Sequence, residues 1–258
     1  MKRPRIRVIP MLLLKKAGLY KTVKFKDPKY VGDPINALKI FNEKEVDEMV
    51  FLDITASREN HSPNIGMLAD IASECFMPLC YGGGITSVDM MREVLHVGVE
   101  KIALNTQAVL NPSLITEAAQ AFGSSTVVVS IDAKKTLFGG YQVFIRGGQE
   151  KTKLDPVAWA KEVERLGAGE ILINAIDLDG TMKGYDLKLI KSVAEAVNIP
   201  VIAAGGAGSL SDFRAAVREG GASAVGAGSF FVFQGKHRAV LITYPTPADV
   251  LETFGDLV

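Results

Sequence analysis

The chain has 258 residues, of which 48% are apolar and 22% are charged, so it can bury a full-sized core and is neither disordered nor of low complexity. Its 29 Lys and Arg residues balance 29 Asp and Glu residues, and this even charge does not indicate nucleic-acid binding. The apolar runs are too short for a membrane-spanning helix, and Lys15 and Lys16 stand where a signal peptide would carry small residues. We therefore expect a cytoplasmic protein that binds neither membrane nor nucleic acid.

Short β-rich segments alternate with amphipathic helical segments along the chain, which predicts parallel strands joined by crossover helices. Helices are predicted, for example, at positions 87–97, 112–122 and 155–166. Eight such units in about 250 residues are typical of a closed (β/α)8 barrel. A doubly wound open sheet is the alternative, but no glycine-rich dinucleotide motif follows the first strand. The predicted strands are residues 7–14, 48–53, 78–81, 101–104, 127–132, 170–173, 200–203 and 224–227.

An internal repeat supports the barrel. Residues 77–84 and 199–206 match at a constant offset, and Ser87 falls on Ser209 in the same register. The simplest interpretation is one barrel domain over residues 1–258, built from half-barrels at about 1–123 and 124–258. Two equivalent binding sites are then expected.

Glycine-rich loops follow the third and seventh predicted strands, at positions 82–84 and 205–208. Glycine lets the backbone approach an anion closely, and free amides at a helix start favour negative charge. These glycines could simply form tight turns, but their symmetric pairing favours phosphate binding. We predict two phosphate sites and hence a substrate with phosphate at both ends. The sites comprise Gly83, Gly84, Asn105 and Thr106 in one half, and Gly205, Gly206, Gly228 and Ser229 in the other.

Carboxylates at the ends of barrel strands are candidates for acid–base chemistry, because barrel active sites form there. Asp132 and Asp179 are our candidate catalytic residues, whereas for Asp53 and Asp177 a loop-capping role is an equal alternative. The first strand carries Leu13 where the fifth carries Asp132, so one half lacks its carboxylate.

Positive charge is concentrated near the start of the chain, with ten Lys or Arg residues and one acidic residue among positions 1–29. Lys15 and Lys21 belong to this segment, which could attract an anionic substrate to the barrel mouth or be only a solvated basic edge. The two cysteines, Cys75 and Cys80, have no further thiol near them, and the three histidines share no ligand spacing. We expect no metal and no cofactor.

Four charged residues, two of each sign, stand at the starts of predicted strands and hence at the bottom of the barrel. They are Arg7, Glu48, Lys101 and Glu170. They could form a closed salt-bridged ring. Such a ring at the bottom face usually serves stability, but it could also gate a central passage.

Together these motifs resemble HisF, the cyclase subunit of imidazole glycerol phosphate synthase, from the start of the chain to about Phe233. The resemblance is carried by residues 50–57, 81–85, 127–134, 167–172, 179–181 and 205–208. It implies a (β/α)8 barrel that receives ammonia from a glutaminase partner docked at the bottom and passes it to a bis-phosphorylated ribulosyl substrate. It also implies that the four-charge ring is an ammonia gate and that Gly180 joins the second phosphate site.

The departures from this resemblance concern the chemistry. HisF carries a catalytic aspartate at the position of Leu13, and losing one acid–base group costs on the order of 10²–10⁴ in rate. The tail at 235–247 also differs. After the fifth predicted strand, residues 136–153 are predicted to form a polar hairpin over the mouth that could act as a lid. The pattern is similar to HisF-like paralogues of surface-polysaccharide synthesis, in which a HisF–HisH-like pair supplies ammonia for amidine formation on an acetamido sugar.

Three functions stay open from the sequence. The chain could be such a diverged synthase subunit, acting with a third, sugar-modifying protein. It could be a histidine-pathway cyclase in which another residue replaces the lost carboxylate. It could also be a non-catalytic ammonia conduit or glutaminase-activating scaffold.

Overall fold

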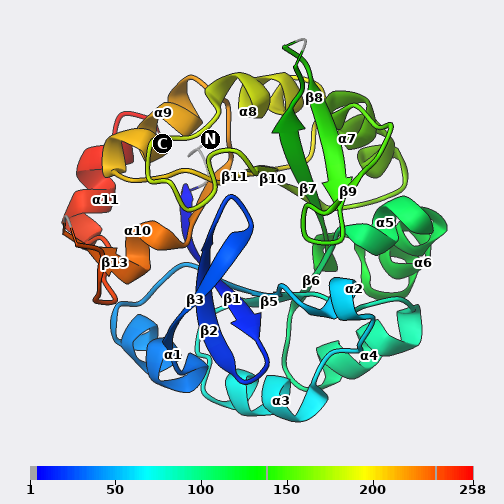
Figure 1. Cartoon of the computed structure of the whole chain (residues 1–258), viewed down its shortest axis with the longest axis horizontal. Coiled ribbons are helices and arrows are strands. Elements are labelled where there is room, and N and C mark those ends of the chain that lie inside the picture. Colours follow the sequence, from blue (N-terminus) through cyan, green and yellow to red (C-terminus); the bar gives the residue numbers. More distant parts are fainter. Residues whose placement is uncertain (1–4, 138, 236, 258) are drawn as a thin grey trace.

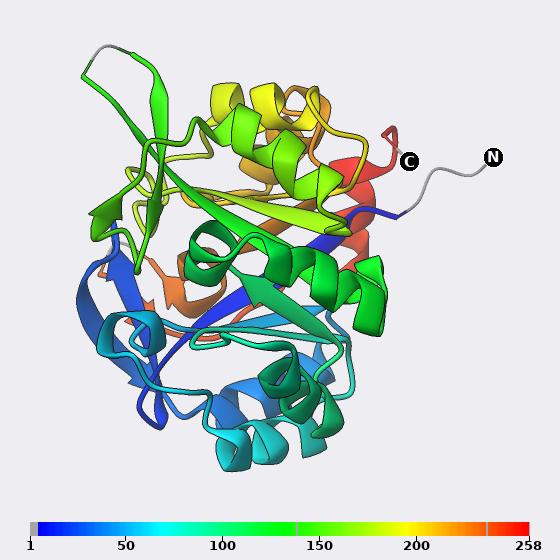
Figure 2. The same cartoon turned by 90° about the vertical axis from the view of Figure 1, so that its right-hand side faces the viewer.

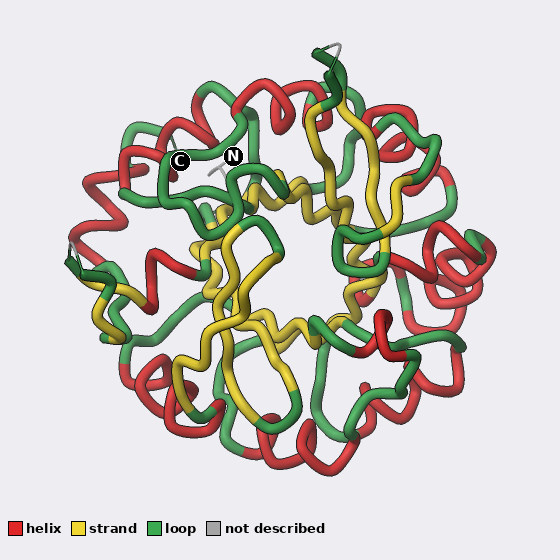
Figure 3. Tube along the Cα trace, viewed as in Figure 1, coloured by secondary structure: helices red, strands yellow, loops and turns green. Residues whose placement is uncertain are grey.

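The computed structural model describes residues 5–137, 139–235 and 237–257, and its centre is a closed barrel of eight parallel strands (Figure 1, Figure 3). Each strand pairs with the next along the chain and the last pairs with the first, which confirms the (β/α)8 fold and excludes the open sheet. The barrel strands are β1 (Arg7–Lys15), β4 (Met49–Asp53), β5 (Leu79–Gly82), β6 (Lys101–Leu104), β7 (Val127–Lys135), β10 (Glu170–Ala175), β11 (Val201–Ala204) and β12 (Ala224–Ala227).

Helices surround the barrel, and several begin at a residue whose side chain accepts a backbone N–H of the first turn. Ser87 and Ser209 cap α4 and α9 in this way, and Asp155 caps α7. The main helices are α1 (Pro34–Glu43), α3 (Ile65–Ser73), α4 (Val88–His96), α6 (Ser113–Phe122), α7 (Pro156–Arg165), α8 (Leu187–Ala194), α9 (Leu210–Arg218) and α11 (Pro247–Phe254), with short helices α2 (Ala56–Glu59), α5 (Thr106–Leu110) and α10 (Ser229–Val232) and a 3-10 turn at Ser124–Thr126. The three helices named from the sequence are confirmed to within two residues. In the described ranges, none of these helices is long and apolar enough to cross a bilayer.

Side chains alternate between the barrel interior and the surrounding helices along every strand. On β4, Val50 belongs to the small interior cluster and Phe51 to the large outer core. The same alternation on β1 sends Ile9 and Met11 inward and Leu12 and Leu14 outward. The strands therefore present stacked layers of side chains along the barrel axis, from the bottom to the mouth.

Three hairpins extend the barrel units. In Figure 2 the first two, coloured blue and green, project from one end of the barrel. They are β2 (Gly18–Val23) with β3 (Lys26–Gly32), β8 (Tyr141–Ile145) with β9 (Glu150–Lys151), and β13 (Phe233–Gln234) with β14 (Ala239–Val240). The hairpin expected within 136–153 is present, and Phe138 lies outside the described residues.

The β2–β3 hairpin was not predicted from the sequence. Its two-residue turn has positive φ at Lys24 (54°) and Phe25 (63°). Such turns usually carry Asn-Gly or Asp-Gly, because those residues tolerate positive φ. The sequence therefore lacks the turn signal that would have revealed this hairpin.

The segment after the last barrel strand packs through an aromatic cluster. Phe231 is fully buried, and its ring lies 5.5 Å from Tyr244 and 6.5 Å from Phe41, measured between ring centroids. Thr246 then starts α11 with a capping box that includes Asp249. The aromatic cluster thus ties the tail to the outer core.

We predict that Phe231→Ala lowers the free energy of unfolding by about 3–5 kcal/mol, because it removes a fully buried ring. Phe76, whose side chain is 83% exposed, provides the matched control. Phe76→Ala should change stability by less than about 0.5 kcal/mol. Denaturant unfolding measures both, and equal effects of the two substitutions would contradict the packing described.

Candidate active site

A cavity of about 520 Å³ opens where the barrel strands end, and residues from all eight strands contribute to its wall. Its size suits a small-molecule ligand. In (β/α)8 enzymes this is the end of the barrel at which active sites form. The cavity is therefore the candidate active site.

Nearly all the residues that the sequence singled out at the mouth line this one cavity. They are Lys21, Asp53, Gly83, Gly84, Asn105, Thr106, Asp132, Asp179, Gly180, Gly205, Gly206, Gly228 and Ser229. Lys15 is not among the lining residues, and its ammonium instead lies 5.5 Å from the ring centre of Tyr20. Asp177 accepts the backbone N–H of Lys135 at 3.0 Å, which is the loop-capping alternative.

The two glycine loops lie in different halves of the cavity wall, and both require glycine. Gly84 has φ 73° and Gly206 has φ 119°, backbone conformations that side chains disfavour. A Cβ at Gly84 would collide with the carbonyl oxygen of His61, and one at Gly206 with that of Gly184. Each loop therefore presents bare backbone to the cavity.

Asp132 and Asp179 are buried in the cavity wall with altered acidities. Burial, together with the charge of Asp179, raises the pKa of Asp132 to about 7, although a hydrogen bond with the side chain of Asn174 acts in the opposite direction. Burial likewise raises the pKa of Asp179 to about 6, against the opposing effects of Lys21 and Thr22. Both carboxyl groups therefore exchange protons near neutral pH, as general acid–base catalysis requires.

Lys21, on β2, is buried beside these carboxylates. Its ammonium donates to the carbonyl oxygen of Met11 at 2.6 Å. Burial lowers the pKa of Lys21 to about 8, although the charge of Asp179 acts in the opposite direction. A cation is thus fixed within the cavity wall rather than on a solvated edge.

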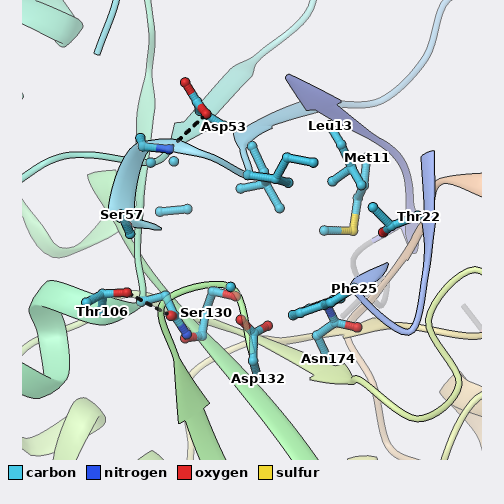
Figure 4. A pocket seen from close by; sticks show the side chains of 18 of the residues that line it. Met11, Leu13, Thr22, Phe25, Asp53, Ser57, Thr106, Ser130, Asp132 and Asn174 are labelled. Carbon is cyan, nitrogen blue, oxygen red and sulfur yellow. Dashed lines mark hydrogen bonds between the residues drawn. The ribbon is translucent and has the colours of Figure 1, made fainter. Parts of the chain in front are cut away.

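The wall that faces Asp132 is apolar. Figure 4 shows Leu13 and Met11 across the cavity from Asp132, with Phe25 at the side. Leu13 belongs to β1 and pairs with Leu52 of β4. Leu13 therefore offers no carboxylate across from Asp132. Asp53, which is labelled on the same side of the cavity, caps its own loop by accepting the backbone N–H groups of Thr55 and Ala56.

At the opposite end of the barrel the four charged residues form a closed ring. Arg7 contacts both Glu48 and Glu170, and the ammonium of Lys101 lies 2.9 Å from Glu48 and 3.1 Å from Glu170. Burial lowers the pKa of Arg7 and of Lys101, but the adjacent glutamates outweigh it and raise both values. The glutamates are 2% and 5% exposed, so the ring neutralises two nearly buried carboxylates.

The hairpins supply cavity residues that sequence reasoning missed, among them Phe25 and Arg146. Phe25 comes from the turn of the β2–β3 hairpin, and Arg146 from the segment between β8 and β9. The backbone N–H of Arg146 donates to Thr106 Oγ1 at 3.0 Å. The sequence gives no signal of the contact between Arg146 and Thr106, because that contact depends on how the hairpin folds back over the barrel mouth.

We predict that Asp132→Asn becomes increasingly stabilising, relative to the unsubstituted chain, as pH rises from 4 to 7. A raised folded-state pKa contributes stability that is fully present below the unfolded value, near 3.8, and is lost as pH rises through about 7. Asparagine has no such loss, and the difference is at most about 4 kcal/mol. Urea unfolding across this range measures it.

The control for that measurement is Asp70→Asn, which removes an exposed carboxylate from α3. Its effect on stability should not change over the same pH range. A pH-independent effect of Asp132→Asn would contradict the buried, proton-holding carboxyl.

In sequence, the chain matches one known family and several known proteins. Residues 7–238 match the family described as histidine biosynthesis protein. The chain is 55% identical over 241 residues to the putative imidazole glycerol phosphate synthase subunit hisF2 of Pseudomonas aeruginosa, covering 93% of this chain and 96% of the relative. It is 48% identical over 246 residues to the putative subunit hisF3 of Vibrio vulnificus, covering 95% of each. It is 48% identical over 225 residues to imidazole glycerol phosphate synthase subunit HisF of Alkaliphilus metalliredigens, covering 87% and 89%.

Proposed function

The chain belongs to the histidine biosynthesis protein family, among its HisF-type imidazole glycerol phosphate synthase subunits, and from this premise we propose that it is a diverged cytoplasmic synthase subunit with a changed reaction. It uses ammonia that a HisH-like glutaminase partner delivers through the barrel. The observation that carries the proposal is the closed charge ring at one end combined with Leu13 opposite Asp132 at the other. All four residues of the proposed gate join in one ring, whereas Leu13 stands where the resemblance implies a proton-transfer group.

The barrel axis supports ammonia delivery. The glutaminase docks at the bottom, where Arg7, Glu48, Lys101 and Glu170 act as the gate. Above this ring the interior is lined by small and apolar side chains such as Cys80, and it leads toward the cavity. Neutral ammonia can pass an apolar layer at a low desolvation cost, whereas an ammonium ion cannot. The ring and the interior therefore favour a passage for ammonia rather than for ions.

The mouth supports binding of a bis-phosphorylated small molecule. Two glycine loops that require bare backbone lie in the wall, together with the buried cation of Lys21. Asp132 and Asp179 are the proposed acid–base residues, and the charge of Asp179 also raises the pKa of Asp132. Leu13 cannot transfer a proton, so the reaction at this mouth differs from imidazole-ring closure.

The pathway part of the proposal is amidine formation on an acetamido sugar of a surface polysaccharide, in which a third, sugar-modifying protein binds the sugar and the ammonia nitrogen replaces the oxygen of its acetamido group. Two relatives carry the numbered labels hisF2 and hisF3, which supports a role beside that of the histidine-pathway subunit. A conduit without chemistry of its own is the alternative that Leu13 favours.

We predict that the purified chain, given ammonium and the bis-phosphorylated ribulosyl substrate, forms imidazole glycerol phosphate very slowly. Leu13→Asp should raise this rate by about 10²–10⁴, because it restores a second acid–base group. Leu13→Asn is the matched control, since it adds polarity without proton transfer.

The outcomes of this assay separate the alternatives. Fast product formation by the unsubstituted chain would contradict a changed reaction and support the histidine-pathway cyclase. A Leu13→Asp variant that binds the substrate but stays as slow as Leu13→Asn would favour the conduit.

We further predict that Ala224→Leu blocks the passage. Ala224 is fully buried in the interior cluster, on the strand position that pairs with Arg7. In a complex with the proposed HisH-like glutaminase and in the Leu13→Asp background, product formation from glutamine should fall, while formation from added ammonium persists.

Ala216→Leu controls for overpacking, because Ala216 is equally buried but lies in the outer core. Both substitutions cost about 1–3 kcal/mol of stability. Equal losses of glutamine-dependent and ammonium-dependent activity in Ala224→Leu would contradict delivery along the axis.

A further inference from the structure

Arg238, on the segment that joins β13 to β14, places its guanidinium at the second phosphate site. Its Nη2 donates to the carbonyl oxygen of Gly180 at 3.1 Å and to Ser229 Oγ at 3.4 Å. The guanidinium also lies over the ring of Phe233, 4.6 Å from the ring centre. Gly180 and Ser229 both line the cavity, and Arg238, which is not itself among the lining residues, contacts them at the edge of the wall.

The positive charge of Arg238 is not neutralised by the residues that the structure describes. Within 5–137, 139–235 and 237–257, no carboxylate forms an ion pair with it, and its Nε and Nη1 donate no hydrogen bond. A partly buried guanidinium with free donors is matched in geometry to a phosphate or carboxylate, which it can bind through two parallel bonds. The free donors therefore call for an anionic ligand.

The first phosphate site has an arginine too, but that charge is already paired. Arg146 Nε donates to Glu150 at 2.9 Å, and its Nη1 donates to the carbonyl oxygen of Ser57 at 3.2 Å. The contact of Arg146 with Thr106 Oγ1 is made by its backbone N–H and not by its guanidinium. Thr106 and Ser229 occupy equivalent positions, as the first residues of α5 and α10. The two halves thus share a backbone plan, but the arginine that contacts Ser229 has no ion pair among the described residues, whereas the one that contacts Thr106 is paired with Glu150.

Resting on the two-phosphate cavity of the proposed function, we infer that Arg238 is the cationic ligand of the second phosphate site and that it fixes the orientation of the substrate. A cavity with two similar glycine loops would hold a bis-phosphate in either direction. Asp132 and Leu13 lie on opposite walls, so only one direction presents the reacting group to the carboxyl. The unpaired charge of Arg238 draws the more highly charged phosphate end to Gly206 and Gly228.

The ammonium of Lys21 supports this asymmetry. It lies so close to Gly228 that a Cβ there would collide with it. Two cations therefore border the second site, and both come from hairpins added to the barrel: Lys21 from β2 and Arg238 from the β13–β14 turn. The substrate class is a small molecule with a dianionic phosphate monoester or a diphosphate at this end.

The test uses inorganic phosphate and pyrophosphate as probes, titrated into the full chain while the backbone amide signals of Gly84 and Gly206 are followed by NMR. In the unsubstituted chain both probes should shift both signals, with tighter binding at Gly206. Arg238→Gln should weaken binding at Gly206 by about ten- to a hundredfold and leave Gly84 unchanged, since one charged ligand is lost. Arg238→Lys should restore part of the affinity, because lysine keeps the positive charge but lacks the two parallel N–H donors of the guanidinium.

Arg92→Gln is the control, since it removes an exposed cation from α4 with the same change in net charge. It should alter neither site. An affinity at Gly206 that stays within twofold in Arg238→Gln, while both loops still bind phosphate, would overturn the role of Arg238 and leave the two-phosphate cavity standing. Phosphate that shifts neither loop in the unsubstituted chain would overturn both.

Discussion

The alternation of side chains along closed parallel strands is the constraint on which this structure depends. Because successive residues point to opposite faces, every second residue of each strand must fit inside the barrel. On β1 this places Arg7, Ile9, Met11 and Leu13 at rising levels between the bottom and the mouth. A charged ring, an apolar interior and a functional cavity are thus stacked on one axis, and a change at one level leaves the others in register.

In the ring at the bottom of the barrel, the burial of the two glutamates requires that their charges be paired. Glu48 and Glu170 are almost fully enclosed, and an unpaired carboxylate there would be strongly destabilising. Arg7 and Lys101 each contact both glutamates, so every charge has two neighbours of opposite sign. A closed ring of this kind can open at one pair while the remaining contacts hold the charges, which suits a gate better than two isolated pairs would.

At the mouth, an apolar wall and added hairpins determine the electrostatics. Burial in the cavity wall favours the protonated form of Asp132, while Lys21 favours the charged form of Asp179. The hairpins contribute cations that a bare barrel lacks. In this chain a leucine stands where the resemblance implies a proton-transfer group, and cations border one end of the proposed ligand site, which together support the proposal of altered chemistry on an anionic ligand.

The sequence by itself determined the elements that local patterns encode. Alternating strand and helix segments predicted the barrel, glycines after the third and seventh strands predicted both loops, and charges at strand starts predicted the ring members. Tertiary structure alone decided which of these groups meet. Arg7 and Glu170 are 163 positions apart, and Arg238 reaches Gly180 across 58. Barrel closure brings Arg7 to Glu170, and a hairpin whose turn carries no glycine brings Lys21 into the cavity. Contacts between such distant segments depend on where the backbone folds back, and local residue patterns do not encode this.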